Sequence, residues 1–224
     1  MSTGDATRKY SQPWVVFCDF DGTITREETL VGMFNTFVPE LYAQRSKQMY
    51  AGRITLKEAV RSLIESIPSV RYPEILDYFM RQPLRAGFED FVVFLEKHSV
   101  PLVVVSGGIR EAILSRLGPL ADKVAAIYAP QVSAEGAFMR VHSDFEGSTE
   151  LICKVDVMRR YRYEKAVAVG NGITDVAMAR HASVVFARDF LARWMNEHGL
   201  AYHRWRDFND VRRKLKALWT RNPG

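Results

Sequence analysis

The chain has 224 residues, enough for one large or two small domains, and its 47% hydrophobic and 25% charged residues are typical of a globular protein. No apolar run reaches the length that spans a bilayer, the polar residues 1–12 lack the apolar segment of a signal peptide, and two cysteines are too few for a disulfide framework. The net charge of +5 comes with no nucleic-acid-binding motif, so we expect a cytoplasmic protein with neither a membrane nor a nucleic-acid partner.

Residues 14–18 form a short apolar run that ends in two carboxylates, Asp19 and Asp21, followed directly by Gly22 and Thr23. The run does not alternate polar and apolar residues, which is typical of a parallel strand buried on both faces. Such a strand delivers its carboxyl end to the ligand crevice of an open α/β sheet. Neighbouring carboxylates repel one another unless a cation or a shared proton compensates, and Mg²⁺ is a hard cation that suits oxygen ligands.

Residues 29–85 show helical periodicity and no strong strand signal. Thr55 and Glu58 have the spacing of a capping box, and Pro68 ends the helix that follows. An ordinary crossover between parallel strands needs only one helix, so this segment is expected to be an inserted helical lid. The expected helices cover residues 30–37, 39–50, 55–67 and 72–80.

From residue 87 onward strands and helices alternate, which indicates a parallel sheet covered on both faces. Residues 131–141 are an exception and are typical of a hairpin that turns at Glu135 and Gly136. The expected strands are 100–105, 124–128, 166–169 and 183–186. The expected helices are 88–97, 108–117, 149–161, 173–180, 190–198 and 208–219.

The last of these helices carries much of the excess positive charge. A nucleic-acid-binding surface is one interpretation of that charge. Val211, Leu215 and Leu218 recur on one face, however, so a packed terminal helix with a solvated basic face is the favoured interpretation. The positive charge would also help to attract an anionic substrate.

Three further groups of polar residues lie near strand ends or helix starts. Ser106, Gly107 and Gly108 follow a strand, where a hydroxyl and exposed N–H groups suit an oxyanion. Lys154 lies near a helix start and can neutralise a phosphate, and residues 170–175 carry oxygens that can complete a cation site. Each group alone also fits an ordinary turn or a solvated side chain, but together they indicate phosphoryl transfer.

In this order the four groups resemble the four motifs of the haloacid dehalogenase superfamily, most of whose members are phosphatases. The resemblance implies a doubly wound parallel α/β sheet with an inserted α-helical cap. It implies that Asp19 is the nucleophile that forms an aspartyl-phosphate and that Asp21 is the general acid and base. Ser106 and Lys154 would hold the transferring phosphoryl group, and the substrate would be a small phosphorylated metabolite.

The resemblance also implies Mg²⁺ as the cofactor, held by Asp19, the main-chain carbonyl of Asp21, Asn171 and Asp175. The family usually has Asp where this chain has Asn171, and an amide oxygen brings no charge to a metal. Either Asn171 ligates weakly, or Asp175 makes a larger contribution to the metal site. We therefore expect an active enzyme with a weakened affinity for Mg²⁺, which substitution of Asn171 by Asp would raise.

The helical segment resembles the C1-type cap of the phosphoserine phosphatase-like branch. This resemblance divides the chain into core residues 1–28, cap residues 29–85 and core residues 86–224. Glu27, Glu28, Gly107 and Gly108 are the expected substrate-binding residues, and in phosphoserine phosphatases the residue matching Glu28 recognises an ammonium group. Leu63 replaces the carboxylate-binding Arg of those enzymes, and the nearby Arg61 is expected on another face of its helix.

A closer resemblance is to the 2-hydroxy-3-keto-5-methylthiopentenyl-1-phosphate phosphatase family, and it is carried by residues 54–60, 186–191 and 206–208. It implies hydrolysis of that compound or of a related sugar-like phosphate by a monomer or homodimer. The cysteine-rich segment that precedes the lysine in that family is missing here. Phosphoserine phosphatase activity and a non-catalytic phosphate-binding regulatory role are the alternatives.

Overall fold

The computed structural model describes residues 11–221, so the polar segment 1–10 lies outside the described residues. A six-stranded parallel sheet forms its centre, in the order β3-β2-β1-β6-β7-β8. The strands are β1 (Ser11–Cys18), β2 (Leu102–Val105), β3 (Ala126–Tyr128), β6 (Arg162–Gly170), β7 (Val184–Ala187) and β8 (His203–Arg204). The order reverses at β1, which confirms the predicted doubly wound sheet.

Alternate residues of β1 face opposite layers, as the two-residue period of a strand requires. Val16 and Cys18 pack in the layer of α5 (Phe88–Lys97), α6 (Arg110–Leu117) and α10 (Phe208–Arg221). Val15 and Phe17 pack against the layer of α7 (Lys154–Met158) and α8 (Val176–Arg180). A smaller cluster adds α9 (Asp189–Glu197) over β7. Because both faces are covered, β2 and the carboxyl halves of β1 and β6 are buried and carry almost no polar residues.

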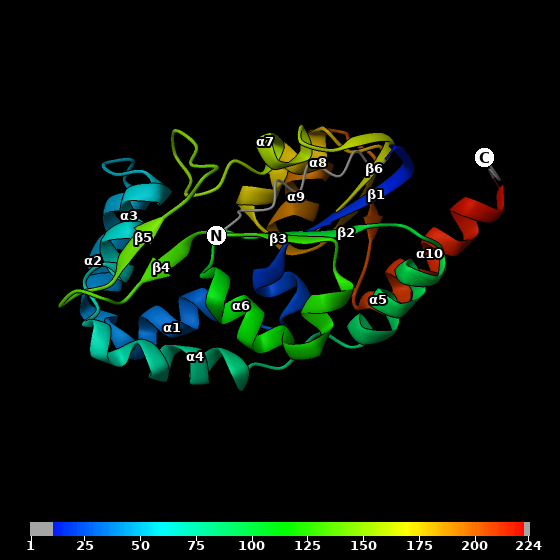
Figure 1. Ribbon diagram of the computed structural model, residues 1–224. Helices are drawn as coiled ribbons and strands as arrows, with labels where there is room; N and C mark the ends of the chain where they lie inside the picture. Colours follow the sequence, from blue (N-terminus) through cyan, green and yellow to red (C-terminus); the bar gives the residue numbers. More distant parts are fainter. Residues whose placement is uncertain (1–10, 222–224) are drawn as a thin grey trace.

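Four helices separate β1 from α5 and lie together at one end of the molecule (Figure 1). They are α1 (Thr29–Phe37), α2 (Pro39–Tyr50), α3 (Leu56–Ile64) and α4 (Tyr72–Met80). The predicted capping box is confirmed, because the Thr55 hydroxyl accepts from the Glu58 N–H while the Glu58 carboxylate accepts from the Thr55 N–H. A separate apolar cluster joins these helices to α6 and to the hairpin β4 (Gln131–Ser133) and β5 (Arg140–His142). The hairpin therefore belongs to the apolar cluster of the helical segment rather than to that of the sheet.

The helix expected over residues 149–161 is much shorter, because α7 begins only at Lys154. The preceding backbone makes other hydrogen bonds: the Cys153 N–H donates to Phe145, and the Lys57 N–H of the helical segment donates to Thr149. The helix expected over residues 173–180 begins instead as a 3₁₀ turn, Ile173–Asp175. The two-residue strand β8 was not predicted, since so short a strand has no periodic pattern.

The basic terminal helix has the packed face that its pattern predicts. Val211 and Leu215 of α10 are buried against α5, and Trp219 stacks on Phe94 with ring centroids 5.2 Å apart. Within residues 11–221, no helix combines the length and the apolar character needed to cross a bilayer.

Candidate active site

The predicted polar groups meet at one edge of the sheet. Asp19 follows β1, Ser106 follows β2 and Asn171 follows β6, and these three strands are direct neighbours. Since parallel strands carry their carboxyl ends to the same edge, residues far apart in the sequence become the floor of one pocket. Lys154, at the first position of α7, lines the same pocket.

Lys154 is a buried cation held between two carboxylates. Its Nζ lies 2.6 Å from Asp19 Oδ1 and 2.6 Å from Asp175 Oδ1. Burial lowers the pKa of Lys154, but the charges of Asp175 and Asp19 outweigh that effect and raise it above its ordinary value. The ammonium group therefore remains charged at neutral pH and can attract a phosphoryl group to this floor.

Asp19 combines a held oxygen with a free one. Lys154 takes Oδ1, whereas Oδ2 accepts no hydrogen bond from any residue in the described part of the chain. Burial and the neighbouring charge of Asp175 raise the pKa of Asp19 to about 7, even though Lys154 acts in the opposite direction. The arrangement fixes the side chain while leaving one oxygen able to attack.

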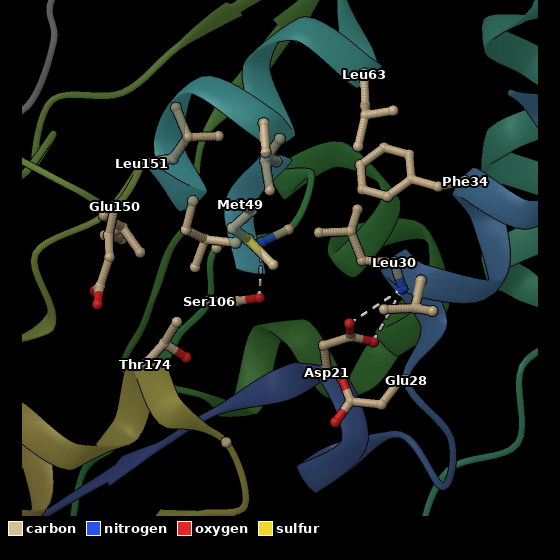
Figure 2. A pocket seen from close by; sticks show the side chains of 18 of the residues that line it. Asp21, Glu28, Leu30, Phe34, Met49, Leu63, Ser106, Glu150, Leu151 and Thr174 are labelled. Atoms are coloured by element: carbon tan, nitrogen blue, oxygen red, sulfur yellow. Dashed lines mark hydrogen bonds between the residues drawn. The ribbon is translucent and has the colours of Figure 1, made fainter. Parts of the chain in front are cut away.

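Asp21 lies at the N-terminus of α1. Its carboxylate accepts hydrogen bonds from the N–H groups of Thr29 and Leu30, as Figure 2 shows for Leu30 beside Glu28. Burial, then the charges of Glu28 and Asp19, raise the pKa of Asp21 to about 8. A carboxyl group that stays protonated near neutral pH is suited to donate a proton to a leaving group.

The Ser106 turn presents polar groups to the pocket. Ser106 Oγ accepts a hydrogen bond of 3.1 Å from the Gly108 N–H, which fixes the hydroxyl at the pocket wall. The Gly107 N–H has no acceptor within residues 11–221. Both groups can donate to a phosphoryl oxygen, as the sequence predicts.

Asp175 lies beneath the pocket rather than in it. Lys154 takes its Oδ1, and the N–H groups of Asn171 and Gly172 donate to its Oδ2 at 2.9 Å each. Gly170 is needed for this approach, because a Cβ there would lie 2.5 Å from the Asp175 carboxyl. Asp175 does not line the pocket, and its hydrogen bonds hold Lys154 and the turn at Asn171.

The remaining oxygen donors have the chemistry that suits a hard divalent cation. Asp19 Oδ2, the Asp21 carbonyl and the Asn171 amide oxygen are the oxygen ligands that Mg²⁺ prefers. Among the residues that the structure describes, no group of three or more His, Cys, Asp or Glu side chains is arranged to hold a metal. Burial, and then the surplus of nearby carboxylates, raises the pKa of Asp19 and Asp21, and a cation would offset that negative charge.

The two adjacent glutamates that are expected to bind substrate lie in different places. Glu28 lines the pocket, and its Oε1 accepts a 2.7 Å hydrogen bond from Asn171 Nδ2. Glu27 does not line the pocket; its side chain is 73% exposed and lies 3.9 Å from Arg26. Of the substrate-binding predictions, the structure thus brings Glu28, Gly107 and Gly108 to the site and leaves Glu27 outside.

The pocket of about 240 Å³ has an apolar upper wall. Leu63 lies in this wall, whereas the Arg61 guanidinium points to the Val141 carbonyl and to Glu146. Lys154 on the floor is therefore the one basic side chain among the residues that line the pocket. The apolar wall comes from α1, α2, α3 and the segment before α7: Leu30, Val31, Phe34, Met49, Leu56, Val60, Leu63 and Leu151. Figure 2 labels Phe34, Met49, Leu63 and Leu151 in its upper half.

Sequence reasoning missed a buried arginine under the loop that carries Asp21. The Arg85 guanidinium donates to the carbonyl oxygens of Gly22, Thr23, Thr25 and Arg26 over distances of 2.6 to 3.1 Å. It ties the loop after β1 to the segment that returns from α4. Nothing in the local pattern distinguishes Arg85 from a surface arginine, so only the tertiary contacts reveal this role.

Comparison with known families agrees with this geometry. The sequence matches the family described as haloacid dehalogenase-like hydrolase over residues 16–180, a range that contains every floor residue. The chain is a haloacid dehalogenase-like hydrolase. The family predicted from the sequence is thereby confirmed.

Among the haloacid dehalogenase-like hydrolases, several curated relatives share one name. The 2-hydroxy-3-keto-5-methylthiopentenyl-1-phosphate phosphatase of Microcystis aeruginosa (strain NIES-843) is 45% identical over 90% of this chain and 97% of its own length. A protein of the same name from Geobacillus kaustophilus is 33% identical over 91% of this chain and 96% of its own length. These relatives confirm the predicted enzyme class, a phosphatase.

Solved structures of this hydrolase family show the same fold. A substrate-bound phosphoserine phosphatase complex has a TM-score of 0.67 at 18% identity and covers 91% of this chain and 98% of its own. A phospho-aspartyl intermediate analogue of phosphoserine phosphatase has a TM-score of 0.65 at 19% identity, covering 92% and 99%. At such identities the likeness concerns the fold alone.

Proposed function

We propose that the protein is a Mg²⁺-dependent phosphomonoesterase whose substrate is 2-hydroxy-3-keto-5-methylthiopentenyl-1-phosphate or a close analogue. The observation that carries the proposal is a pocket with a charged floor and an apolar wall. The floor suits a phosphate, and the wall suits an alkyl or thioether tail rather than the ammonium and carboxylate of phosphoserine.

The reaction divides between two carboxyl groups. Asp19 Oδ2 attacks phosphorus, the ester P–O bond breaks, and Asp21 gives its proton to the departing oxygen. Asp21 then takes a proton from water as that water attacks the aspartyl-phosphate, which releases inorganic phosphate and restores Asp19. Lys154, Ser106 Oγ and the Gly107 N–H hold the phosphoryl oxygens in both steps.

Magnesium has a limited, defined place in this proposal. Asp19, the Asp21 carbonyl and Asn171 would hold the ion. When bound, it would offset the negative charge that otherwise keeps a carboxylate from a phosphate. Asp175 contributes by fixing Lys154 and the Asn171 turn rather than by touching the ion.

Helices α1–α4 are proposed to act as a cap. They supply most of the apolar wall while the sheet supplies the floor, so opening between the two would admit substrate and closing would exclude water. The apolar wall also argues against phosphoserine as the substrate, because Leu63 offers no charge to a carboxylate.

The test is release of inorganic phosphate by the purified protein from a panel of phosphomonoesters with Mg²⁺. We expect 2-hydroxy-3-keto-5-methylthiopentenyl-1-phosphate to be hydrolysed with a higher kcat/KM than phosphoserine, and Asp19→Asn to abolish both reactions. Preference for phosphoserine would refute the substrate assignment. Binding of phosphate without any turnover would favour a regulatory protein instead.

A further inference from the structure

The amide of Asn171 is clamped from two sides. Its Nδ2 donates to Glu28 Oε1 at 2.7 Å, and its Oδ1 accepts from the Thr23 hydroxyl at 2.9 Å. Residue 22 must be glycine for this contact, since a Cβ there would lie 2.6 Å from Asn171 Nδ2 and 2.7 Å from Glu28 Oε1. The loop after β1, the start of α1 and the end of β6 are thus built around one carboxylate–amide pair.

Glu28 brings a charge that no side chain neutralises. Within the described residues, Glu28 forms no ion pair, and the one basic side chain of the pocket, Lys154, is already held by Asp19 and Asp175. The Glu28 carboxylate lies beside Asp21 at the floor of the pocket (Figure 2). An amide partner satisfies a hydrogen bond but leaves the negative charge uncompensated.

We propose that Glu28 supplies the negative charge that the neutral Asn171 cannot, so that the Glu28–Asn171 pair serves as the charged half of the divalent-cation site. This inference rests on the proposed metal-dependent function. The pair distributes two tasks over two residues: Asn171 offers an oxygen, and Glu28 orients the amide and adds the charge. Because Glu28 directly precedes α1, the proposed cation site extends toward α1, the first helix of the proposed cap.

Metal affinity, measured without substrate, tests this inference. Mn²⁺ is the probe, and free Mn²⁺ is followed by electron paramagnetic resonance in a titration. Glu28→Gln keeps the size and a hydrogen-bonding group but removes the charge, so we expect Mn²⁺ affinity to fall about 10–100-fold. Glu27→Gln is the matched control. Glu27 is the neighbouring residue and its side chain is exposed, so removing its charge should leave Mn²⁺ affinity unchanged.

Moving the charge gives a stricter test. The double variant Glu28→Gln and Asn171→Asp moves the carboxylate from position 28 to position 171. Its Mn²⁺ affinity should return to within about threefold of wild type, so the effects of the two substitutions should not be additive. Asn171→Asp alone places two carboxylates in contact, so in EDTA its melting temperature should be lower than that of wild type. As Mn²⁺ is added, the melting temperature of this variant should rise more steeply than that of wild type.

The outcomes separate this inference from the function on which it rests. If wild type binds Mn²⁺ and hydrolyses phosphomonoesters while Glu28→Gln binds Mn²⁺ equally well, the inference is refuted and the function stands. A Glu28→Gln variant that changes only the KM for substrate refutes it in favour of substrate recognition. If wild type binds no Mn²⁺, both fail. Should Glu28→Gln not fold, Glu28→Ala, which also removes the charge, replaces it with the same expected direction.

Discussion

The floor and the upper wall of the pocket are built from different parts of the chain and have opposite chemistry. The floor comes from the ends of β1, β2 and β6 and the start of α7, and it gathers carboxylates around Lys154. The wall comes largely from α1, α2 and α3 and is mostly apolar, with the hydroxyl groups of Tyr42, Ser46 and Tyr50 as its polar members. In the proposed function, this difference assigns the reaction to the sheet and the choice of substrate to the helical segment. A change in the floor should affect every substrate, and a change in the wall should affect some more than others.

The largest effect is expected at the floor. Lys154→Met removes the cation between Asp19 and Asp175 and leaves two buried carboxylates unpaired, which should cost about 3–5 kcal/mol of unfolding free energy. Turnover of every substrate should fall by about 10³-fold because the phosphoryl group loses a positive partner. Urea unfolding and phosphate release measure the two effects. Equal stability of wild type and variant would contradict the buried ion pairs.

A wall substitution should alter selectivity instead. Leu63→Arg places a charge in the apolar wall, so kcat/KM for a substrate with an apolar tail should fall about 10–100-fold relative to phosphoserine. Leu63→Met, which preserves volume and polarity, is the control and should retain the wild-type ratio. Melting temperatures of both variants check that the fold persists. An unchanged ratio in folded Leu63→Arg would show that the wall does not select the substrate.

A smaller effect is expected where floor and wall are joined. Arg85→Lys keeps the charge but cannot bond four carbonyl groups at once, so the loop carrying Asp21 should loosen. We expect a loss of about 1–3 kcal/mol in stability and faster amide hydrogen exchange within residues 22–26. Arg81→Lys, on an exposed side chain paired with Asp77, should change neither measurement.

The last effect depends on pH and is confined to the floor. Asp21 has an ordinary pKa of 3.8 when unfolded and about 8 when folded. The protonated carboxyl therefore favours the folded state, and this contribution is lost as pH rises from about 4 to about 8. Asn at this position never ionises, so the melting temperature of Asp21→Asn in EDTA, relative to wild type, should rise by about 10 °C between these limits. A difference that is constant with pH would contradict the raised pKa.

Local patterns predicted the elements whose signals are continuous. The run before Asp19 became β1, the alternation after residue 87 became the covered sheet, and Thr55 with Glu58 formed the capping box. Prediction failed where backbone groups bond outside their own element. Residues 149–153 have helical composition, but their backbone is committed to a turn that contacts residue 57.

The site could be predicted only in part, because motif signals are local whereas the partners of a side chain often lie in other elements. Asp19, Ser106 and Lys154 carry motif signals, and their elements bring them to one pocket. Glu27 and Glu28 are indistinguishable as neighbours in the sequence, yet the start of α1 turns one toward Asn171 and the other toward solvent. Asp175 keeps its place in the motif, but it lies outside the pocket lining and accepts hydrogen bonds from the N–H groups of Asn171 and Gly172.

The sequence by itself determined the family, the doubly wound sheet and the candidate residues of the site, because hydrophobic periodicity and short motifs are properties of neighbours along the chain. The tertiary structure alone decided the partners of those residues: Lys154 between two carboxylates, Arg85 under the loop of Asp21, and Glu28 against Asn171. These contacts join residues that are 21 to 143 positions apart. Their geometry depends on how strands and helices pack, and no local pattern records that packing.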